Sequence, residues 1–461
     1  MKTANQILAN LRSGALSAVD LMAETYDQIA RVNPKVNAIT GLLDRDAALD
    51  LARQADQSDA TGPLHGLPIA IKDLANAEGF VTTRGSPLFA NDKPAPADDI
   101  MVARMRAAGA LVIGKTNAPE FGLGSHTTNP VFGPTRNPWD LSRTAGGSSG
   151  GAAVALATGM LALADGSDMM GSLRNPAGWT NTYGLRPSFG AVPSEPHADS
   201  FLTQLATNGP MARTPEDLAM LLSVQAGDDP RQPHFTPLPK ADSPKPLRIG
   251  WLADWDGAYQ MEAGILDTCS EALAAFSALG HAVVPLSAGF SAEAIWESWI
   301  TLRSWQVSTL LAPLEALPNG RTSLNRQAIW ELDRGKAMSA HEVHKASVTR
   351  SQWYKQAAHL FEQVDVLALP TAQVWPFDVT LDWPQEIAGT ALDTYHRWME
   401  VVVPASLLGL PALAVPAGFG AAGLPIGLQL IGPRGSDFSL IQMAQPYHDA
   451  VDWTDRLPPA V

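Results

Sequence analysis

The sequence is poor in cysteine, in charged residues overall and in basic residues in particular. Among its 461 residues there is one cysteine, Cys269, which excludes an intrachain disulfide framework and a multi-cysteine zinc site. A single cysteine also fits a reducing compartment, and we expect a cytoplasmic protein. Charged residues make up 17% of the chain, and acidic residues exceed basic ones to give a formal net charge of -14. This charge repels phosphate backbones and anionic lipids, so neither nucleic acid nor a membrane surface is an expected partner.

The N-terminal residues 1–14 lack an apolar core and a small-residue cleavage site, so we expect no signal peptide. The longest uncharged run, 401–433, is long enough to raise the question of a membrane span. Pro404, Pro411 and Pro416, together with several glycines, would break a spanning helix repeatedly. We therefore expect short buried strands joined by turns in this run.

Helix and strand patterns alternate along the chain. Helical spacing follows Ser17 and is expected to stop at Asn33 and Pro34, and a second helix is predicted at 44–56. A strand at 66–73, a helix at 99–108 and a strand at 110–114 come next. The proline-rich residues 228–246 form the one plausible linker, and 292–360 are mostly helical and rich in tryptophan. Helix-to-strand units of this kind build α/β sheets.

The stretch 146–177 contains two glycine-flanked turns, each bearing a serine. Ser148 and Ser172 lie 24 positions apart (172 minus 148), separated by an uncharged run at 152–164 that predicts a buried helix or a helix followed by a strand. A serine hydroxyl is a weak nucleophile and needs a base within hydrogen-bonding distance. Lys72, at the end of the buried strand 66–73, is a candidate because burial lowers the pKa of a lysine.

Two other interpretations compete with a lysine base. The G-x-S-x-G pattern at 146–150 matches the nucleophile turn of α/β-hydrolases, which requires a preceding strand and a late histidine. Residues 140–145 make a poor strand, and His448 is the least unsuitable histidine. A phosphate-binding turn is weaker still, because no Gly-Lys-Ser/Thr follows. Ser149 and Ser167 are interpreted as turn or hydrogen-bonding residues.

Ordered sequence pieces resemble the amidase signature family. They lie at 66–73, 114–117, 146–151, 165–177, 209–214, 365–371, 409–412 and 423–429 and cover essentially the whole chain. The resemblance implies a Ser-cisSer-Lys triad, with Ser172 as nucleophile, Ser148 as bridging serine after a cis peptide bond, and Lys72 as base. It further implies oxyanion donors in the backbone N–H groups of four residues and bracing of their turn by two others: Met169, Met170, Gly171 and Ser172 as donors, Asp168 and Arg174 as braces.

One departure from the family pattern concerns the turn itself. Most members have a glycine where this chain has Met170, and methionine is costly if the position needs positive φ. We expect instead a side chain that projects toward the acyl pocket. Trp179 also stands where a small residue is usual, so it too is predicted to contact substrate. Gly122, Gly124 and Ser125, within 120–128, complete the predicted substrate contacts.

The resemblance implies a single α/β domain spanning 1–461, with a large mixed, mostly parallel sheet covered by helices on both faces. Its catalytic core would be 66–214, and the tryptophan-rich 292–398 would shape the pocket. The expected reaction is hydrolysis of a small-molecule amide through an acyl-enzyme, without metal or cofactor. Esters, anilides and carbamates share the acyl-transfer step. A component of an amidotransferase that works with aminoacyl-tRNA partners, an esterase and a silent binding protein stay open, as does a homodimer.

Overall fold

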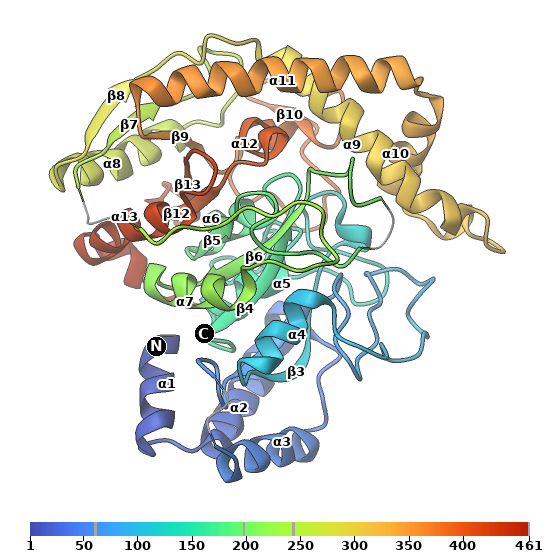
Figure 1. Ribbon diagram of the computed structural model, residues 1–461, viewed down its shortest axis with the longest axis vertical. Coiled ribbons are helices and arrows are strands. Elements are labelled where there is room, and N and C mark those ends of the chain that lie inside the picture. Colours follow the sequence, from blue (N-terminus) through green and yellow to red (C-terminus); the bar gives the residue numbers. More distant parts are fainter. Residues whose placement is uncertain (60–61, 197–198, 242–244, 460–461) are drawn as a thin grey trace.

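The computed structural model describes residues 1–59, 62–196, 199–241 and 245–459 (Figure 1). Three N-terminal helices, drawn in blue at the bottom of Figure 1, pack beside a small three-stranded sheet. The helices are α1 (Ala4–Ser13), α2 (Ala18–Val36) and α3 (Arg45–Gln57), and the strands, in spatial order, are β1 (Ile39–Thr40), β3 (Leu111–Thr116) and β2 (Pro68–Lys72). This small sheet carries Lys72 at the end of its outer strand.

Helix α2 begins where the sequence predicts, because Ser17 accepts a hydrogen bond from the Asp20 N–H. The prediction that Asn33 and Pro34 end this helix is wrong. Pro34 lies in the last turn, and the helix continues to Val36 before Asn37 caps it in the left-handed conformation. A proline this near the end removes one backbone hydrogen bond without forcing the chain to leave the helix.

The large sheet has eight strands among the described residues. Their order is β4 (Leu163–Asp168), β6 (Thr207–Ala212), β5 (Tyr183–Arg186), β12 (Ala412–Phe419), β13 (Pro425–Ile431), β9 (Val366–Pro370), β7 (Arg248–Trp251) and β8 (Ala282–Pro285). The sheet is mixed as predicted, but "mostly parallel" is wrong, because parallel pairing is confined to β9 with β7 and β7 with β8. Parallel neighbours need a helical crossover, whereas the short connection at 420–424 obliges β12 and β13 to pair antiparallel.

Helices flank the large sheet. The shorter ones are α4 (Ile100–Ala107), α5 (Gly150–Ala157), α6 (Arg174–Thr180), α7 (Pro215–Gln225), α8 (Ile265–Ala278), α12 (Val403–Leu408) and α13 (Asp437–Ala450). Both α6 and α8 pack against β12 and β13, and α5 packs against β4. Helix α9 (Ala292–Glu315) packs against both α10 (Arg326–Ala337) and α11 (Ala340–Gln363), and α11 runs along the top of Figure 1. A two-stranded ribbon, β10 (Glu386–Ile387) with β11 (Thr390–Ala391), follows them.

The two long uncharged runs are buried in this architecture. Residues 152–164 form most of α5 and the start of β4, so the helix-then-strand alternative is the one realised. Residues 401–433 form the short helix α12 before the two expected strands. No helix within the described ranges is long and apolar enough to cross a membrane. Residues 242–244 of the predicted linker lie outside the described residues, and the rest of 228–246 contains neither helix nor strand.

Candidate active site

Lys72 lies at the centre of a group of serine oxygens. Its ammonium nitrogen is 2.8 Å from both Ser148 Oγ and Ser149 Oγ, 3.0 Å from Ser167 Oγ and 3.3 Å from the Ser167 carbonyl oxygen. Only 1% of Lys72 is exposed, so this residue is not a surface lysine that merely ends a strand. Ser148 and Ser149 stand at equal distances, so the distances alone do not choose between them.

The environment of Lys72 favours its neutral form. Burial lowers its pKa from 10.5 to about 7, against the opposing charges of Asp165 and Asp168. Asp165 Oδ1 accepts a hydrogen bond from the Lys72 backbone N–H at 3.0 Å, which joins β2 to β4 through a side chain. Burial also raises the pKa of Asp165 to about 6. At neutral pH a large fraction of Lys72 is therefore able to accept a proton.

Ser148 follows a cis peptide bond, Gly147–Ser148, as the resemblance implies. Its hydroxyl lies under the turn that contains Gly122. A Cβ at Gly122 would be 3.5 Å from Ser148 Oγ and 2.9 Å from a methyl carbon of Leu74, and the backbone φ there is +73°. A side chain at position 122 would therefore contact the Ser148 hydroxyl and press against Leu74.

The turn from Asp168 to Ser172 is held by the Asp168 carboxylate. Its oxygens accept hydrogen bonds from the Gly171 N–H at 2.9 Å and the Leu173 N–H at 3.2 Å. Arg174 and Arg186, both without exposed surface, contact this carboxylate at 3.0 and 3.1 Å. Burial alone would raise the pKa of Asp168, but the two arginines hold it well below its usual range. Asp168 thus contacts the turn directly, and Arg174 reaches it through Asp168.

The four predicted oxyanion donors are not equivalent in this structure. The Gly171 N–H is already bonded to Asp168. The N–H groups of Met169, Met170 and Ser172 have no hydrogen-bond acceptor among the described residues. Within the described residues these three groups are therefore unpaired, as donors to a substrate oxygen must be.

Met170 carries no steric cost from a positive φ angle. The residue with positive φ in this turn is Gly171, at +76°, and Met170 is not in the left-handed region. A Cβ at Gly171 would come within 2.8 Å of Val402, so this position requires glycine. Met170 is buried and belongs to the main hydrophobic core.

Ser172 connects the two serine turns. Its carbonyl oxygen accepts a hydrogen bond from the Ser149 N–H at 3.2 Å, and 6% of the residue is exposed. Its hydroxyl makes no hydrogen bond within the described part of the chain, and Ser148 Oγ is bonded to Lys72 instead. A relay between the two hydroxyls requires them to approach, and catalytic hydrogen bonds often tighten only when substrate is bound.

The remaining predicted substrate contacts differ in accessibility. Trp179 has no exposed surface and stacks on Trp398 with ring centres 5.3 Å apart, so it forms a wall behind the serine turn. Ser125 is buried, and its backbone packs against Gly147. Gly124, with φ +97°, has open space beside it. The structure therefore places Trp179 in the core and, of the two glycines, places Gly122 beside the Ser148 hydroxyl.

The α/β-hydrolase interpretation fails on local structure. Residues 140–145 form turns and isolated bridges instead of a strand, and His448 Nδ1 lies 3.0 Å from the Tyr183 hydroxyl. No group of three or more His, Cys, Asp or Glu that could hold a metal ion occurs among the described residues.

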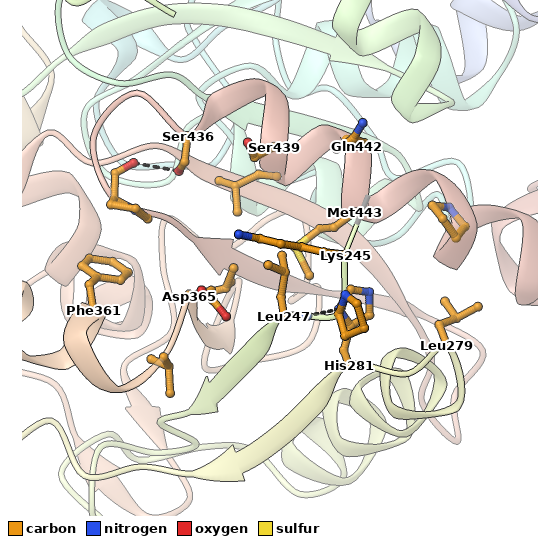
Figure 2. A pocket seen from close by; sticks show the side chains of 16 residues that line it. Lys245, Leu247, Leu279, His281, Phe361, Asp365, Ser436, Ser439, Gln442 and Met443 are labelled. Atoms are coloured by element: carbon orange, nitrogen blue, oxygen red, sulfur yellow. Dashed lines mark hydrogen bonds between the residues drawn. The ribbon is translucent and has the colours of Figure 1, made fainter. Parts of the chain in front are cut away.

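A cavity of about 480 Å³ lies elsewhere, between α13, the end of α11 and the segments that precede β7 and follow α8 (Figure 2). Lys245, Leu247, His281, Asp365 and Met443 are among its lining residues, and the catalytic candidates are not. The candidate active site is therefore the buried serine-lysine cluster and not this cavity.

The sequence did not predict that Lys72 would contact Ser149, Ser167 and Asp165. Asp165 and Ser167 occupy alternate positions of β4, and alternate residues share one face of a strand. That period-two pattern, beside a buried lysine, is the signal that could have found them.

Comparison with known proteins defines the class. The amidase family model matches residues 20–441, and the chain belongs to the amidase family. An acylamidase of Rhodococcus erythropolis is 32% identical over 99% of this chain and 97% of its own length. One component of the glutamyl-tRNA(Gln) amidotransferase of Thermus thermophilus is 34% identical over 97% of each chain. The crystal structure of a bacterial aryl acylamidase of the amidase signature family superimposes with a TM-score of 0.91 at 28% identity, over 98% of both chains. The protein is accordingly an amide-hydrolysing enzyme.

Proposed function

We propose that the protein hydrolyses the C–N bond of a carboxylic amide through an acyl-enzyme on Ser172. Ser148 serves as the proton relay and Lys72 as the general base. The observation that carries this proposal is a fully buried lysine, with its pKa lowered to about 7, at 2.8 Å from Ser148 Oγ. A lysine in that state both accepts and returns a proton near neutral pH.

The reaction proceeds in two halves. Ser172 Oγ attacks the carbonyl carbon and gives its proton to Ser148, whose own proton passes to Lys72. The negative oxygen is stabilised by the N–H groups of Met169, Met170 and Ser172. The C–N bond then breaks, and the departing amine takes the proton back through Ser148. Water attacks the acyl-enzyme by the same route and releases the acid, which restores Ser172.

The substrate class follows from this chemistry. Any small molecule that can acylate Ser172 is a candidate, so anilides, esters and carbamates join simple amides. The acylamidase and aryl acylamidase relatives support acylamides, including aryl acylamides. We place the enzyme in the cytoplasm, with no nucleic acid or membrane partner, on the grounds of its charge and its single cysteine.

Covalent labelling tests the proposal. Treatment with a fluorophosphonate, followed by mass spectrometry of the intact protein and its peptides, should add one phosphonyl group at Ser172. Ser172→Ala should abolish both labelling and amide turnover while the protein stays folded. Ser223→Ala, an exposed serine on α7, is the matched control and should behave as the wild type. Retained turnover in Ser172→Ala would refute the assignment.

A second candidate function is that of an amidotransferase component, favoured by the similarity to the glutamyl-tRNA(Gln) amidotransferase chain of Thermus thermophilus. Such a component would release ammonia for transfer to an aminoacyl-tRNA within a larger assembly. Turnover of amides or anilides by the purified chain, eluting alone in size-exclusion chromatography, would argue against it. Glutamine hydrolysis that depends on an added partner and tRNA would favour it.

A further inference from the structure

A buried charged cluster joins α9, α10 and the segment before α12. Glu331 has no exposed surface and accepts four hydrogen bonds. Oε1 receives them from Arg303 Nε at 2.6 Å, the Tyr395 hydroxyl at 2.8 Å and His396 Nε2 at 2.9 Å, and Oε2 from Ser304 Oγ at 2.6 Å. A buried carboxylate with this many donors is held in one position.

The cluster carries no net charge. Burial alone would raise the pKa of Glu331, but Arg303 and the hydrogen bonds lower it below its usual range, so Glu331 is ionised. Burial lowers the pKa of His396 to about 4, which keeps this ring neutral near pH 7. Arg303 and Glu331 therefore balance each other.

One nitrogen of Arg303 has a poor partner. Nη1 faces the Met169 sulfur at 3.1 Å, whereas Nη2 reaches the Tyr395 hydroxyl at 3.3 Å. The guanidinium carbon also lies 5.2 Å from the centre of the Trp299 ring. A thioether sulfur is a weak acceptor, so this charged donor is the least satisfied of the cluster.

The poor partner belongs to the candidate oxyanion turn. Met169 follows Asp168 directly, and its side chain packs against an apolar cluster from α9 and α10. Leu123 and Phe121, which flank Gly122, belong to the same cluster. An apolar surface thus extends from the Gly122 turn, beside Ser148, to Met169. The Arg303 donor lies at the Met169 end of this surface.

We propose that Arg303 Nη1 donates a hydrogen bond to an uncharged oxygen of the substrate, such as a second carbonyl or an ether oxygen. This inference rests on the proposed function, because Ser172 fixes where the substrate lies. An uncharged oxygen is a stronger acceptor than the Met169 sulfur and leaves the charge balance intact. A substrate carboxylate would add a negative charge beside Glu331 in a buried site and is disfavoured.

The test uses pairs of anilides in which one methylene becomes oxygen. On the acyl side, hexanoyl anilide is compared with 3-ethoxypropanoyl anilide, and on the amine side 4-ethylanilide with 4-methoxyanilide. The preference for oxygen is the ratio of kcat/KM within each pair, compared between wild type and variant. In one of the two series Arg303→Met should lower this preference about 10- to 100-fold, as expected for a hydrogen bond to a charged donor. The methylene substrate should change much less.

Two further variants keep the proposal testable if Arg303→Met fails to fold. Arg303→Met combined with Glu331→Gln removes both charges and should show the same loss of preference. Met169→Leu removes the sulfur but keeps the backbone N–H, so the preference for oxygen should rise. Arg321→Met, an exposed arginine, is the control and should keep the wild-type preference.

The outcomes separate the two proposals. Absence of any oxygen preference in the wild type, or a preference unchanged in the double variant, would overturn the role of Arg303. A fall or no change in Met169→Leu would do the same. Labelling of Ser172 by a fluorophosphonate, measured in parallel, would persist in these cases. If the wild type itself showed neither labelling at Ser172 nor any turnover, the proposed function would be overturned, and this inference with it.

Discussion

Replacing Lys72 by methionine should abolish turnover and at the same time change how stability depends on pH. Methionine fills a similar volume without a titratable group. In the folded protein the pKa of Lys72 is lowered from 10.5 to about 7 by burial, which corresponds to about 5 kcal/mol in favour of the neutral amine. Because the side chain is 1% exposed, solvent screening does not reduce this figure substantially.

The direction follows from proton counting. Between the lowered pKa and 10.5, the unfolded chain holds a proton on Lys72 that the folded protein has lost. Stability therefore rises with pH in this window, by about 1.4 kcal/mol per pH unit. Between about pH 8 and about pH 9.5 the wild type should gain about 2 kcal/mol relative to Lys72→Met. Below the folded pKa both states are protonated and the difference becomes constant.

Urea unfolding of both proteins at several pH values measures this difference. The window above pH 8 is chosen because Asp165, whose pKa is raised to about 6, is ionised there in the wild type. In parallel, kcat/KM of the wild type for a neutral anilide should rise with pH through about 7. Parallel stability curves for the two proteins, or a flat rate profile into acid, would refute the neutral lysine.

Five other substitutions probe neighbouring parts of the site. Ser148→Ala should lower kcat about a thousandfold or more, whereas Ser149→Ala, which loses one hydrogen bond to Lys72, should lower it no more than about tenfold; equal losses would contradict Ser148 as the relay. Gly122→Ala should lower kcat/KM, because its Cβ would approach Leu74 and Ser148. Gly124→Ala carries the same backbone strain with open space beside it, so it should keep more activity. Asp168→Asn should destabilise the protein by about 3–5 kcal/mol in urea unfolding, since two buried arginines lose their counter-ion, and wild-type stability would contradict this.

The sequence predicts local elements and motif order better than it predicts pairing. The residues of β2 are an uninterrupted apolar run with a lysine at its end, which both the pattern and the family resemblance identify. The direction of β12 against its neighbours depends on connection length and on distant strands, so the mostly parallel sheet was predicted wrongly. The end of α2 was mispredicted for a similar reason. Whether a last turn forms after Pro34 depends on the surrounding packing, which the local sequence does not show.

Contacts across large sequence separations account for what was missed in the site. Arg303 and Met169 are 134 positions apart, and nothing in either local sequence indicates that they meet. The accessibility of Trp179 was misjudged for a related reason. Its replacement of a small residue suggested a reshaped pocket, whereas Trp398, far along the chain, provides the ring on which it stacks.

The stretch 146–177 joins two regions with different responses to pH. At the Ser172 turn, Asp168 is ionised and bound by two arginines, so its hydrogen bonds to Gly171 and Leu173 persist over a wide pH range. In the serine-lysine cluster, burial lowers the pKa of Lys72 to about 7 and raises that of Asp165 to about 6, both nearer neutrality. We therefore expect a change of pH to act on the proposed base, Lys72, and to leave the Ser172 turn in place. Since the Ser149 N–H also donates to the Ser172 carbonyl at 3.2 Å, we expect the proposed nucleophile to keep its position while Lys72 gains or loses its proton.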